Sequence, residues 1–286
     1  MQQRRLGDTT VSALGLGGMP MSVRETNDEQ RGIATIHRAL DEGITFIDTA
    51  DAYTPDDRPP GHNEELIARA LREYGGRTEH VLVATKGGMT RDGSHWGVDG
   101  RPEALRKACE QSLRRLGVEA IDLYQHHRPD PDVPYAETMG ALRELLDDGM
   151  IVRAGISNAD PEQIRTAVEV IGDGLVSVQN EFSPRFRSSE PELALCEELG
   201  LAFLPWSPLG GMREAGDLGS RFEGFAEVAR RHDASAQQVC LAWELAKSVV
   251  MIPIPGASRP ESVADSAQAL AIVLKDDDFA LLDAAG

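Results

Sequence analysis

Short segments rich in β-branched residues alternate with stretches of helical periodicity, and this alternation limits the possible folds more than any other feature. The expected strands cover residues 13–18, 45–48, 80–86, 121–127, 151–158, 175–180, 201–206 and 249–254. Between them, apolar residues recur three and four positions apart, as at Leu105, Cys109 and Leu113. Eight strands that each lead into a helix, within 286 residues, predict a (β/α)8 TIM barrel. An open, doubly wound parallel sheet is the alternative.

Residues that begin and end helices agree with this alternation. Pro102 stands where a first helical turn would begin, and Ser235 with Gln238 has the spacing of a capping box. No Pro/Gly/Ser-rich linker, internal repeat or low-complexity run divides the chain. We therefore expect residues 1–286 to form a single barrel domain.

Two additions to a plain barrel are expected. Short alternating runs on either side of Gly7 and Asp8 predict an N-terminal hairpin that closes the barrel floor. Residues 207–221 are glycine-rich and lack periodicity, which predicts a loop over the catalytic face.

Charge and cysteine content restrict partners and location. A formal net charge of -18 disfavours nucleic acid and anionic membranes as partners, so an anionic ligand would need local cationic groups. No apolar run reaches the roughly 18 residues of a membrane helix, and no signal-peptide pattern follows the N-terminus, so we expect a cytoplasmic protein. Cys109, Cys196 and Cys240 are far apart and without metal-ligand spacing, which predicts buried, reduced thiols.

Polar residues gather at the carboxyl ends of the expected strands, where barrel enzymes carry their chemistry. They are Asp48, Tyr53, Lys86, His127, Ser157, Asn158, Gln179, Asn180, Trp206, Ser207 and Arg259. Each has an ordinary structural explanation alone, but their recurrence on successive strand ends predicts one site.

Two adjacent histidines end the strand at 121–127. Side chains on a strand alternate between its faces, so His126 and His127 point to opposite sides and cannot share one role. His127 shares its side with Leu123 and Gln125, and His126 shares the other with Tyr124.

Seven motifs, in order, resemble those of the aldo-keto reductase superfamily over nearly the whole chain. They are DTADAY, the lysine that ends VLVATK, DLYQHHRPD, GISN, VQNEFSP, PWSPLGG and IPIPGASRPES. The resemblance implies a barrel that binds NADP(H) across its mouth and reduces small aldehydes or ketones without metal or flavin. It places the catalytic tetrad on Asp48, Tyr53, Lys86 and His127. His126 occupies a position where the family more often has Leu or Gln, which favours a packing role.

Elementary chemistry supports these tetrad roles. Hydride addition to a carbonyl creates an alkoxide that needs a proton, and a tyrosine with a pKa near ~10 is a poor donor at neutral pH. A lysine about 4 Å away, at an effective dielectric constant of about 20, would stabilise the phenolate by about 4 kcal/mol before desolvation is subtracted. We therefore expect Lys86 to make Tyr53 more acidic, Asp48 to hold Lys86, and His127 to hydrogen-bond the substrate oxygen.

The cofactor expectation follows from the same resemblance, because no Rossmann G-x-G-x-x-G follows the first expected strand. The resemblance puts the nicotinamide carboxamide against Ser157, Asn158 and Gln179, and stacks the ring on Trp206, where many relatives have Tyr. Ser262 and Ser266 stand where relatives often have longer amides. The remaining expected cofactor residues are Gly18, Met19, Ser207, Leu209, Gly211, Gly256, Ser258, Arg259 and Ser262.

Two alternative functions differ from a reductase. A metal hydrolase would use His126, His127, Asp48, Asp51 and His62, but adjacent histidines point apart. A non-catalytic NADPH-binding regulatory subunit is compatible with an intact tetrad.

Substrate choice is expected to depend on three segments. These are residues 87–100, residues 207–221 and the C-terminal tail. Within the first segment, His95 and Trp96 would either line the pocket or lie on a surface loop.

Overall fold

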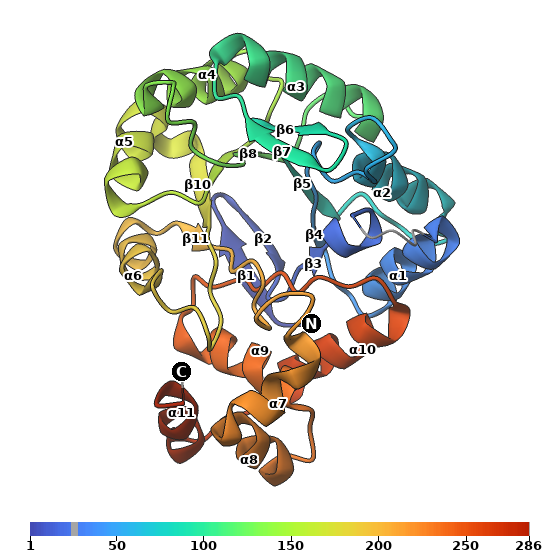
Figure 1. Ribbon diagram of the computed structural model, residues 1–286, viewed down its shortest axis with the longest axis vertical. Coiled ribbons are helices and arrows are strands. Elements are labelled where there is room, and N and C mark those ends of the chain that lie inside the picture. The colour runs from blue at the N-terminus through green and yellow to red at the C-terminus, as the bar shows by residue number, and fades with distance from the viewer. Residues whose placement is uncertain (24–27, 286) are drawn as a thin grey trace.

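The computed structural model describes residues 1–23 and 28–285. Its main sheet has seven parallel strands in the order β11-β10-β9-β8-β5-β4-β3. Their bounds are β3 (Leu16–Gly17), β4 (Phe46–Asp48), β5 (Leu82–Gly87), β8 (Leu123–His126), β9 (Ala154–Ser157), β10 (Leu175–Gln179) and β11 (Ala202–Phe203). Figure 1 shows the helices arranged in a ring around these strands. The architecture is a (β/α)8 barrel, as the alternation predicted.

Helices cover the outside of the sheet, and their ends carry the residues that favour such ends. Ser235 and Gln238 form the predicted capping box at the start of α9, and α3 begins at Pro102. The helices are α1 (Glu29–Asp41), α2 (His62–Glu73), α3 (Pro102–Leu116), α4 (Tyr135–Asp147), α5 (Pro161–Ile171), α6 (Glu190–Leu199), α7 (Leu218–Arg221), α8 (Glu223–Arg231), α9 (Ala236–Lys247), α10 (Pro260–Gln268) and α11 (Asp276–Asp283). No described helix is long and apolar enough to span a membrane.

The eighth predicted strand, 249–254, closes the barrel without forming a regular strand. Its backbone bonds to β11 on one side, where Ile252 donates to the carbonyl of Phe203 over 2.8 Å. On the other side the amide of Gly15 donates to the carbonyl of Pro253 over 2.9 Å. Pro253 and Pro255 have no N–H to donate, so a continuous ladder cannot form. The predicted strand was therefore wrong as an element, although the segment lies where the barrel requires it.

The N-terminal hairpin lies at the barrel floor, as predicted. Strands β1 (Gln3–Leu6) and β2 (Thr9–Ser12) pair antiparallel around Gly7, whose φ of 61° is in the left-handed region. Leu6 and Val11 are fully buried in the barrel interior, in one cluster with Phe46 and Leu123. The hairpin therefore seals the end opposite the carboxyl ends of the strands.

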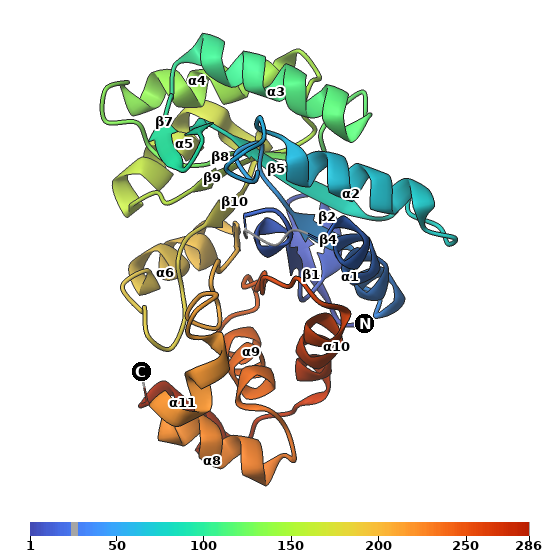
Figure 2. The same cartoon turned by 45° about the vertical axis from the view of Figure 1, so that its right-hand side comes forward.

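The three segments expected to govern specificity differ from simple loops. Residues 87–100 contain a second hairpin, β6 (Met89–Asp92) and β7 (His95–Val98). Residues 207–221 end in a 3-10 turn, η3 (Ala215–Asp217), and helix α7, so the prediction of an irregular loop was wrong for their second half. The tail forms α11, which packs on α8 and α9. Figure 2 shows α8 and α11 grouped away from the strands, so the tail does not border the mouth.

Candidate active site

The carboxyl ends of β4 and β5 bring together a buried ion pair and a tyrosine. The Lys86 ammonium donates to Asp48 Oδ2 over 2.6 Å and to the backbone carbonyl of Thr49 over 2.8 Å. The same Nζ lies 3.4 Å from the Tyr53 hydroxyl and 5.0 Å from the centre of its ring. His127 follows β8, and its ring packs edge-on against Tyr53 with the ring centres 5.6 Å apart. The structure thus gathers all four expected tetrad residues.

Two amides hold the Asp48 carboxylate from the opposite side. Gln179 Nε2 donates to Asp48 Oδ1 over 2.8 Å, and Gln125 Nε2 donates to the same atom over 3.2 Å. Sequence reasoning did not assign Gln125 to the site. The signal was available, because Gln125 lies two residues before His127 and strand side chains two apart share a face.

Asn63, at the start of α2, is a second residue that sequence reasoning missed. Its amide donates to the carbonyl of Gly18 over 3.0 Å, and its Oδ1 accepts from the Thr49 hydroxyl over 2.7 Å. The backbone carbonyl of Tyr53 accepts from the Asn63 amide N–H over 3.1 Å. Asn63 therefore fixes the turn that presents Tyr53, which no local pattern indicated.

The acidity of Tyr53 differs from the expectation. Burial raises the pKa of Tyr53, and the opposing effect of the Lys86 charge does not outweigh it. Asp48 explains part of this result, because its negative charge also raises the pKa of Tyr53 and offsets the field of Lys86. The predicted net lowering of the tyrosine pKa was therefore wrong.

The surroundings favour a charged Lys86 and a neutral His127. Burial alone would lower the pKa of Lys86, but Asp48 and Tyr53 together raise it, which keeps the ammonium charged. Burial lowers the pKa of His127 well below its ordinary value, and the charge of Lys86 adds to that effect. A neutral imidazole can donate one hydrogen bond but carries no positive charge into the site.

His126 points away from this site, as strand alternation predicted. Its ring is fully buried with its centre 5.9 Å from that of Tyr135 on α4, and both ring nitrogens lack a partner among the described residues. His62, another residue of the metal alternative, is committed to Ser22 and Glu29. Within residues 1–23 and 28–285, no group of three or more His, Cys, Asp or Glu side chains could hold a metal ion.

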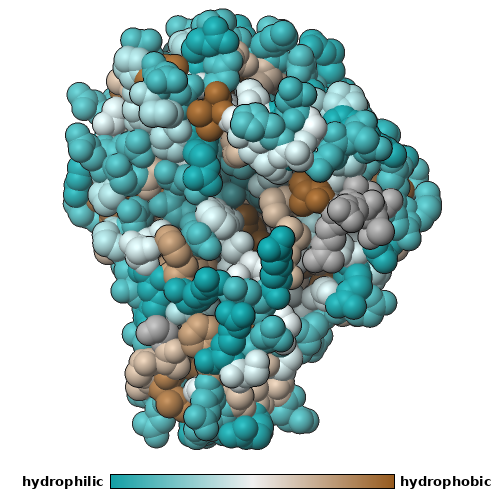
Figure 3. Space-filling model, viewed as in Figure 1, coloured by the Kyte–Doolittle hydropathy of each residue, from teal (hydrophilic) through white to brown (hydrophobic). Residues whose placement is uncertain are grey.

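A pocket of about 260 Å³ opens above the four residues. Figure 3 shows the hollow near the middle of the barrel face, with apolar residues at its floor. Asp48, Tyr53 and His127 lie at its walls. Nine of the expected cofactor residues also line it: Met19, Ser157, Asn158, Gln179, Trp206, Ser207, Leu209, Gly211 and Gly256.

The expected cofactor residues that line this pocket include strained and unpartnered groups. Asn158 and Ser207 have φ angles of 56° and 53°, which side-chain-bearing residues seldom adopt. The indole Nε1 of Trp206 is buried without a hydrogen-bond partner among the described residues. The side-chain amide of Asn158 donates to the carbonyl of His127 over 3.0 Å and to the hydroxyl of Ser157 over 2.9 Å. A planar ring with a carboxamide fits these groups.

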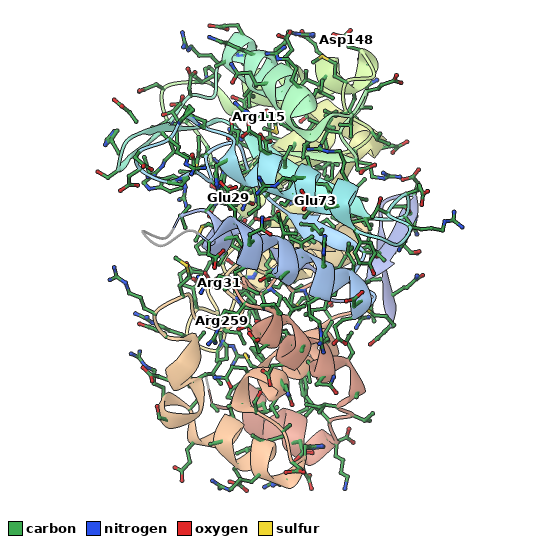
Figure 4. All side chains as sticks on the ribbon, turned by 90° about the vertical axis from the view of Figure 1, so that its right-hand side faces the viewer. Glu29, Arg31, Glu73, Arg115, Asp148 and Arg259 are labelled. Atoms are coloured by element: carbon green, nitrogen blue, oxygen red, sulfur yellow. The ribbon has the colours of Figure 1, made fainter. Side chains whose placement is uncertain are left out.

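Four other expected cofactor residues do not line the pocket: Gly18, Ser258, Arg259 and Ser262. Gly18 lies behind it, where an added Cβ would stand 2.4 Å from Asn63 Oδ1. Arg259 is the N-cap residue of α10, is exposed, and forms no ion pair with any described carboxylate. Figure 4 shows Arg259 and, on the neighbouring helix α1, Arg31.

Two of the segments expected to govern specificity contribute apolar residues to the pocket. Met89 and Trp96 come from the β6–β7 hairpin, and Met212 comes from the segment after β11. His95 is exposed and does not line the pocket. Arg128, which sequence reasoning did not single out, lines the same pocket, and its Nη2 lies 3.4 Å from Asn158 Oδ1.

A pocket at the carboxyl ends of the strands is where (β/α)8 barrel enzymes carry their active sites. The profile of the aldo/keto reductase family matches residues 13–286, and the chain belongs to that family. An uncharacterised oxidoreductase of Schizosaccharomyces pombe is 36% identical over 289 residues, covering 99% of this chain and 89% of that protein. A probable aldo-keto reductase 1 of Glycine max is 35% identical over 298 residues, covering 94% of this chain and 84% of that protein.

Solved structures agree with this membership. A thermostable aldo-keto reductase in complex with the inhibitor epalrestat superposes with a TM-score of 0.84 at 30% identity, covering 100% of both chains. A Klebsiella pneumoniae aldo/keto reductase in complex with NADP and acetate gives 0.80 at 29% identity, covering 99% of this chain and 94% of that one.

Proposed function

We propose that this protein is an NADPH-dependent reductase that converts small aldehydes or ketones to alcohols. When bound, the reduced nicotinamide supplies the hydride that adds to the carbonyl carbon. The developing alkoxide takes its proton from the Tyr53 hydroxyl, and solvent later restores that proton. Carbonyl, NADPH and one proton thus give alcohol and NADP⁺.

Tyr53 acts as the general acid, with Lys86 as its partner. An alkoxide is a much stronger base than a phenolate, so Tyr53 can donate even with a raised pKa. Lys86 stabilises the phenolate that remains, from 3.4 Å away. Asp48 keeps Lys86 charged and aimed, and Gln125 and Gln179 hold Asp48.

His127 acts as a neutral hydrogen-bond donor to the carbonyl oxygen. Its low pKa argues against a charged acid at this position, because an imidazolium beside Lys86 would be costly without water. Its ring lies edge-on to Tyr53, so both groups can reach one oxygen. The carbonyl would be polarised by His127 and protonated by Tyr53.

NADPH is the proposed cofactor. Ser157, Asn158 and Gln179 would hold the carboxamide, and Trp206 would stack on the ring. Gln179 Nε2 is engaged by Asp48, which leaves its carbonyl oxygen to accept from the carboxamide. Arg259 would meet the 2′-phosphate beyond the pocket, supported by its lack of an ion pair with any described residue. The NADP complex of the Klebsiella pneumoniae relative supports the same choice.

The observation that carries the proposal is the Asp48–Lys86–Tyr53 chain at the wall of an apolar pocket. The test is a panel of aldehydes and ketones with NADPH, followed by loss of NADPH absorbance. Turnover of several members would support it. NADPH binding without any turnover would instead favour the regulatory subunit.

Arg259→Ala tests the cofactor choice. A guanidinium–phosphate contact is worth about 1.5–3 kcal/mol, so Kd for NADPH should rise about 10- to 100-fold. Kd for NADH should stay nearly constant, because NADH lacks that phosphate. Quenching of tryptophan fluorescence measures both. An equal loss for the two nucleotides would contradict a 2′-phosphate contact.

A further inference from the structure

One wall of the pocket, formed by the β6–β7 hairpin and the segment after β11, carries apolar side chains. Met89, Trp96 and Met212 form much of this wall. Arg128 is the only arginine or lysine among the described residues that line the pocket. An apolar wall with one convergent cation is a recognition element for a ligand that has an anionic end.

Arg128 is free to bind such a group. The side chain is exposed, and no described carboxylate lies within ion-pair distance of it. Its one hydrogen bond within the described chain is long, 3.4 Å from Nη2 to Asn158 Oδ1. Arg91, also near the mouth, differs because it pairs with Asp56 at 2.6 Å and stacks over Trp96 at 4.1 Å.

The position of Arg128 suits one end of a short substrate. It directly follows His127, whose ring lies against Tyr53. A carbonyl oxygen held between those two side chains leaves the rest of the substrate to extend along the wall that contains Arg128. A carboxylate a few bonds from the carbonyl would therefore meet the guanidinium.

We propose that Arg128 selects carbonyl substrates that also carry a carboxylate, such as small aldehyde acids or keto acids. This inference rests on the proposed reductase function. A guanidinium fits a carboxylate with two parallel hydrogen bonds, which neither an apolar wall nor the neutral His127 provides. With a formal net charge of -18 the protein repels anions overall, so a local cation determines whether they enter.

One acidic neighbour competes for Arg128. Burial raises the pKa of the half-buried Glu181, and the charges of Arg185 and Arg128 oppose that shift. No ion pair joins Arg128 to Glu181 in the described chain. Glu181→Gln would remove this competing charge and should strengthen the preference for a carboxylate.

The experiment compares 4-formylbenzoate with its neutral methyl ester, which has the same ring and aldehyde. The measured quantity is the ratio of kcat/KM for the acid to kcat/KM for the ester. The acid and the ester differ in intrinsic reactivity, but this difference is the same for every variant. It therefore cancels when the ratio of a variant is divided by the ratio of wild type. Arg128→Gln should lower the ratio about two- to fivefold, the range for an exposed ion pair. Arg128→Lys should retain part of the preference, because the charge stays but the two parallel hydrogen bonds are lost.

Arg185→Gln is the matched control. Arg185 is exposed, lies near Glu181 and pairs with Glu214, but does not line the pocket. The substitution removes the same charge and should leave the ratio unchanged. Raising ionic strength from about 0.01 to about 0.5 M screens both the attraction by Arg128 and the repulsion by the net charge of -18, so the test compares two proteins. The wild-type ratio divided by the Arg128→Gln ratio should fall, because the overall repulsion is common to both.

The outcomes separate this inference from the proposed function. If wild type reduces neither compound nor any other carbonyl, the reductase function fails. If it reduces the ester but Arg128→Gln leaves the ratio unchanged, only the role of Arg128 fails. Equal losses for acid and ester would also overturn it, because Arg128 would then act by positioning His127 or Asn158. If Arg128→Gln does not fold, the same ratio measured for Arg128→Met decides the role of Arg128.

Discussion

Asp48 at the barrel mouth and Glu244 in α9 are both buried carboxyl groups, with 2% and 0% of their surfaces exposed. Asp48 accepts hydrogen bonds from Lys86, Gln125 and Gln179. Glu244 has no partner for either carboxyl oxygen among the described residues. The two carboxyl groups are therefore equally buried and differ in their hydrogen-bond partners.

The two carboxyl groups also affect folding differently. A buried charge is tolerated where other groups replace the water it has lost, as Lys86 and two amides do for Asp48. Glu244 has no such groups, and burial raises its pKa well above the ordinary 4.5. It is therefore neutral in the folded protein. Asp48 at the mouth lies beside a cation and two amide donors, while α9 tolerates a carboxylic acid at a cost in stability.

The largest expected effect is on kcat, from a change at Tyr53 beside the Asp48–Lys86 ion pair. Tyr53→Phe should lower kcat by about 10³ or more, because it removes the proposed proton donor. NADPH binding should stay close to unchanged. Stopped-flow or steady-state NADPH oxidation measures the first and fluorescence quenching the second. Tyr74→Phe, whose hydroxyl contacts Asp41 far from the pocket, is the control. Retention of a tenth of kcat would remove Tyr53 from the proposed role.

Breaking the ion pair itself tests whether partners stabilise Asp48. Lys86→Met leaves a buried carboxylate without its cation, which should lower the free energy of unfolding by about 3–5 kcal/mol. Carbonyl reduction should also be lost. Urea unfolding and steady-state kinetics measure the two effects. Loss of activity with full stability would mean that Gln125 and Gln179 are sufficient to hold Asp48.

The adjacent histidines at the end of β8 allow a similar comparison, because His127 lines the pocket and His126 packs against a helix. His127→Ala should lower kcat by about 10², because the hydrogen bond to the carbonyl is lost. His126→Leu should stay within a few-fold of wild type, because His126 faces Tyr135 rather than the pocket. Equal losses in kcat would show that His126 also influences the site.

The smallest expected effect is on the free energy of unfolding, from a change at Glu244. Glu244→Met should raise the free energy of unfolding by about 1–3 kcal/mol at pH 8, because it removes a buried group without partners. In wild type the unfolded chain ionises Glu244 above its ordinary pKa of 4.5 while the folded protein keeps the proton, so stability falls as pH rises. The advantage of Met should therefore be smaller at pH 4 than at pH 8. Urea unfolding at both values tests this, and a pH-independent difference would contradict it.

Several elements were predictable because their signals are local. Strand–helix alternation predicted the barrel, and the capping box at Ser235 and the hairpin at Gly7 were read directly. The misassigned closing segment shows the limit of this approach. Residues 249–254 have strand-like composition, but Pro253 and Pro255 interrupt the pairing that composition suggests.

The candidate site was predictable in part for the same reason. The motif residues gave Asp48, Tyr53, Lys86 and His127 as candidates, and their catalytic roles stay predictions. Asn63 comes from the start of a helix, and its contact with Gly18 spans 45 residues of chain. Only folding could bring that pair together. The single-domain organisation over 1–286 also stays a prediction.

The sequence by itself determined which way the paired histidines point and which residue types meet at the strand ends, because strand periodicity and barrel topology act along the chain. The tertiary structure decided the protonation properties of those residues. Desolvation depends on every atom that surrounds a group, so it outweighs Lys86 at Tyr53, yet at Lys86 itself the neighbouring Asp48 and Tyr53 outweigh it. No local pattern contains that sum.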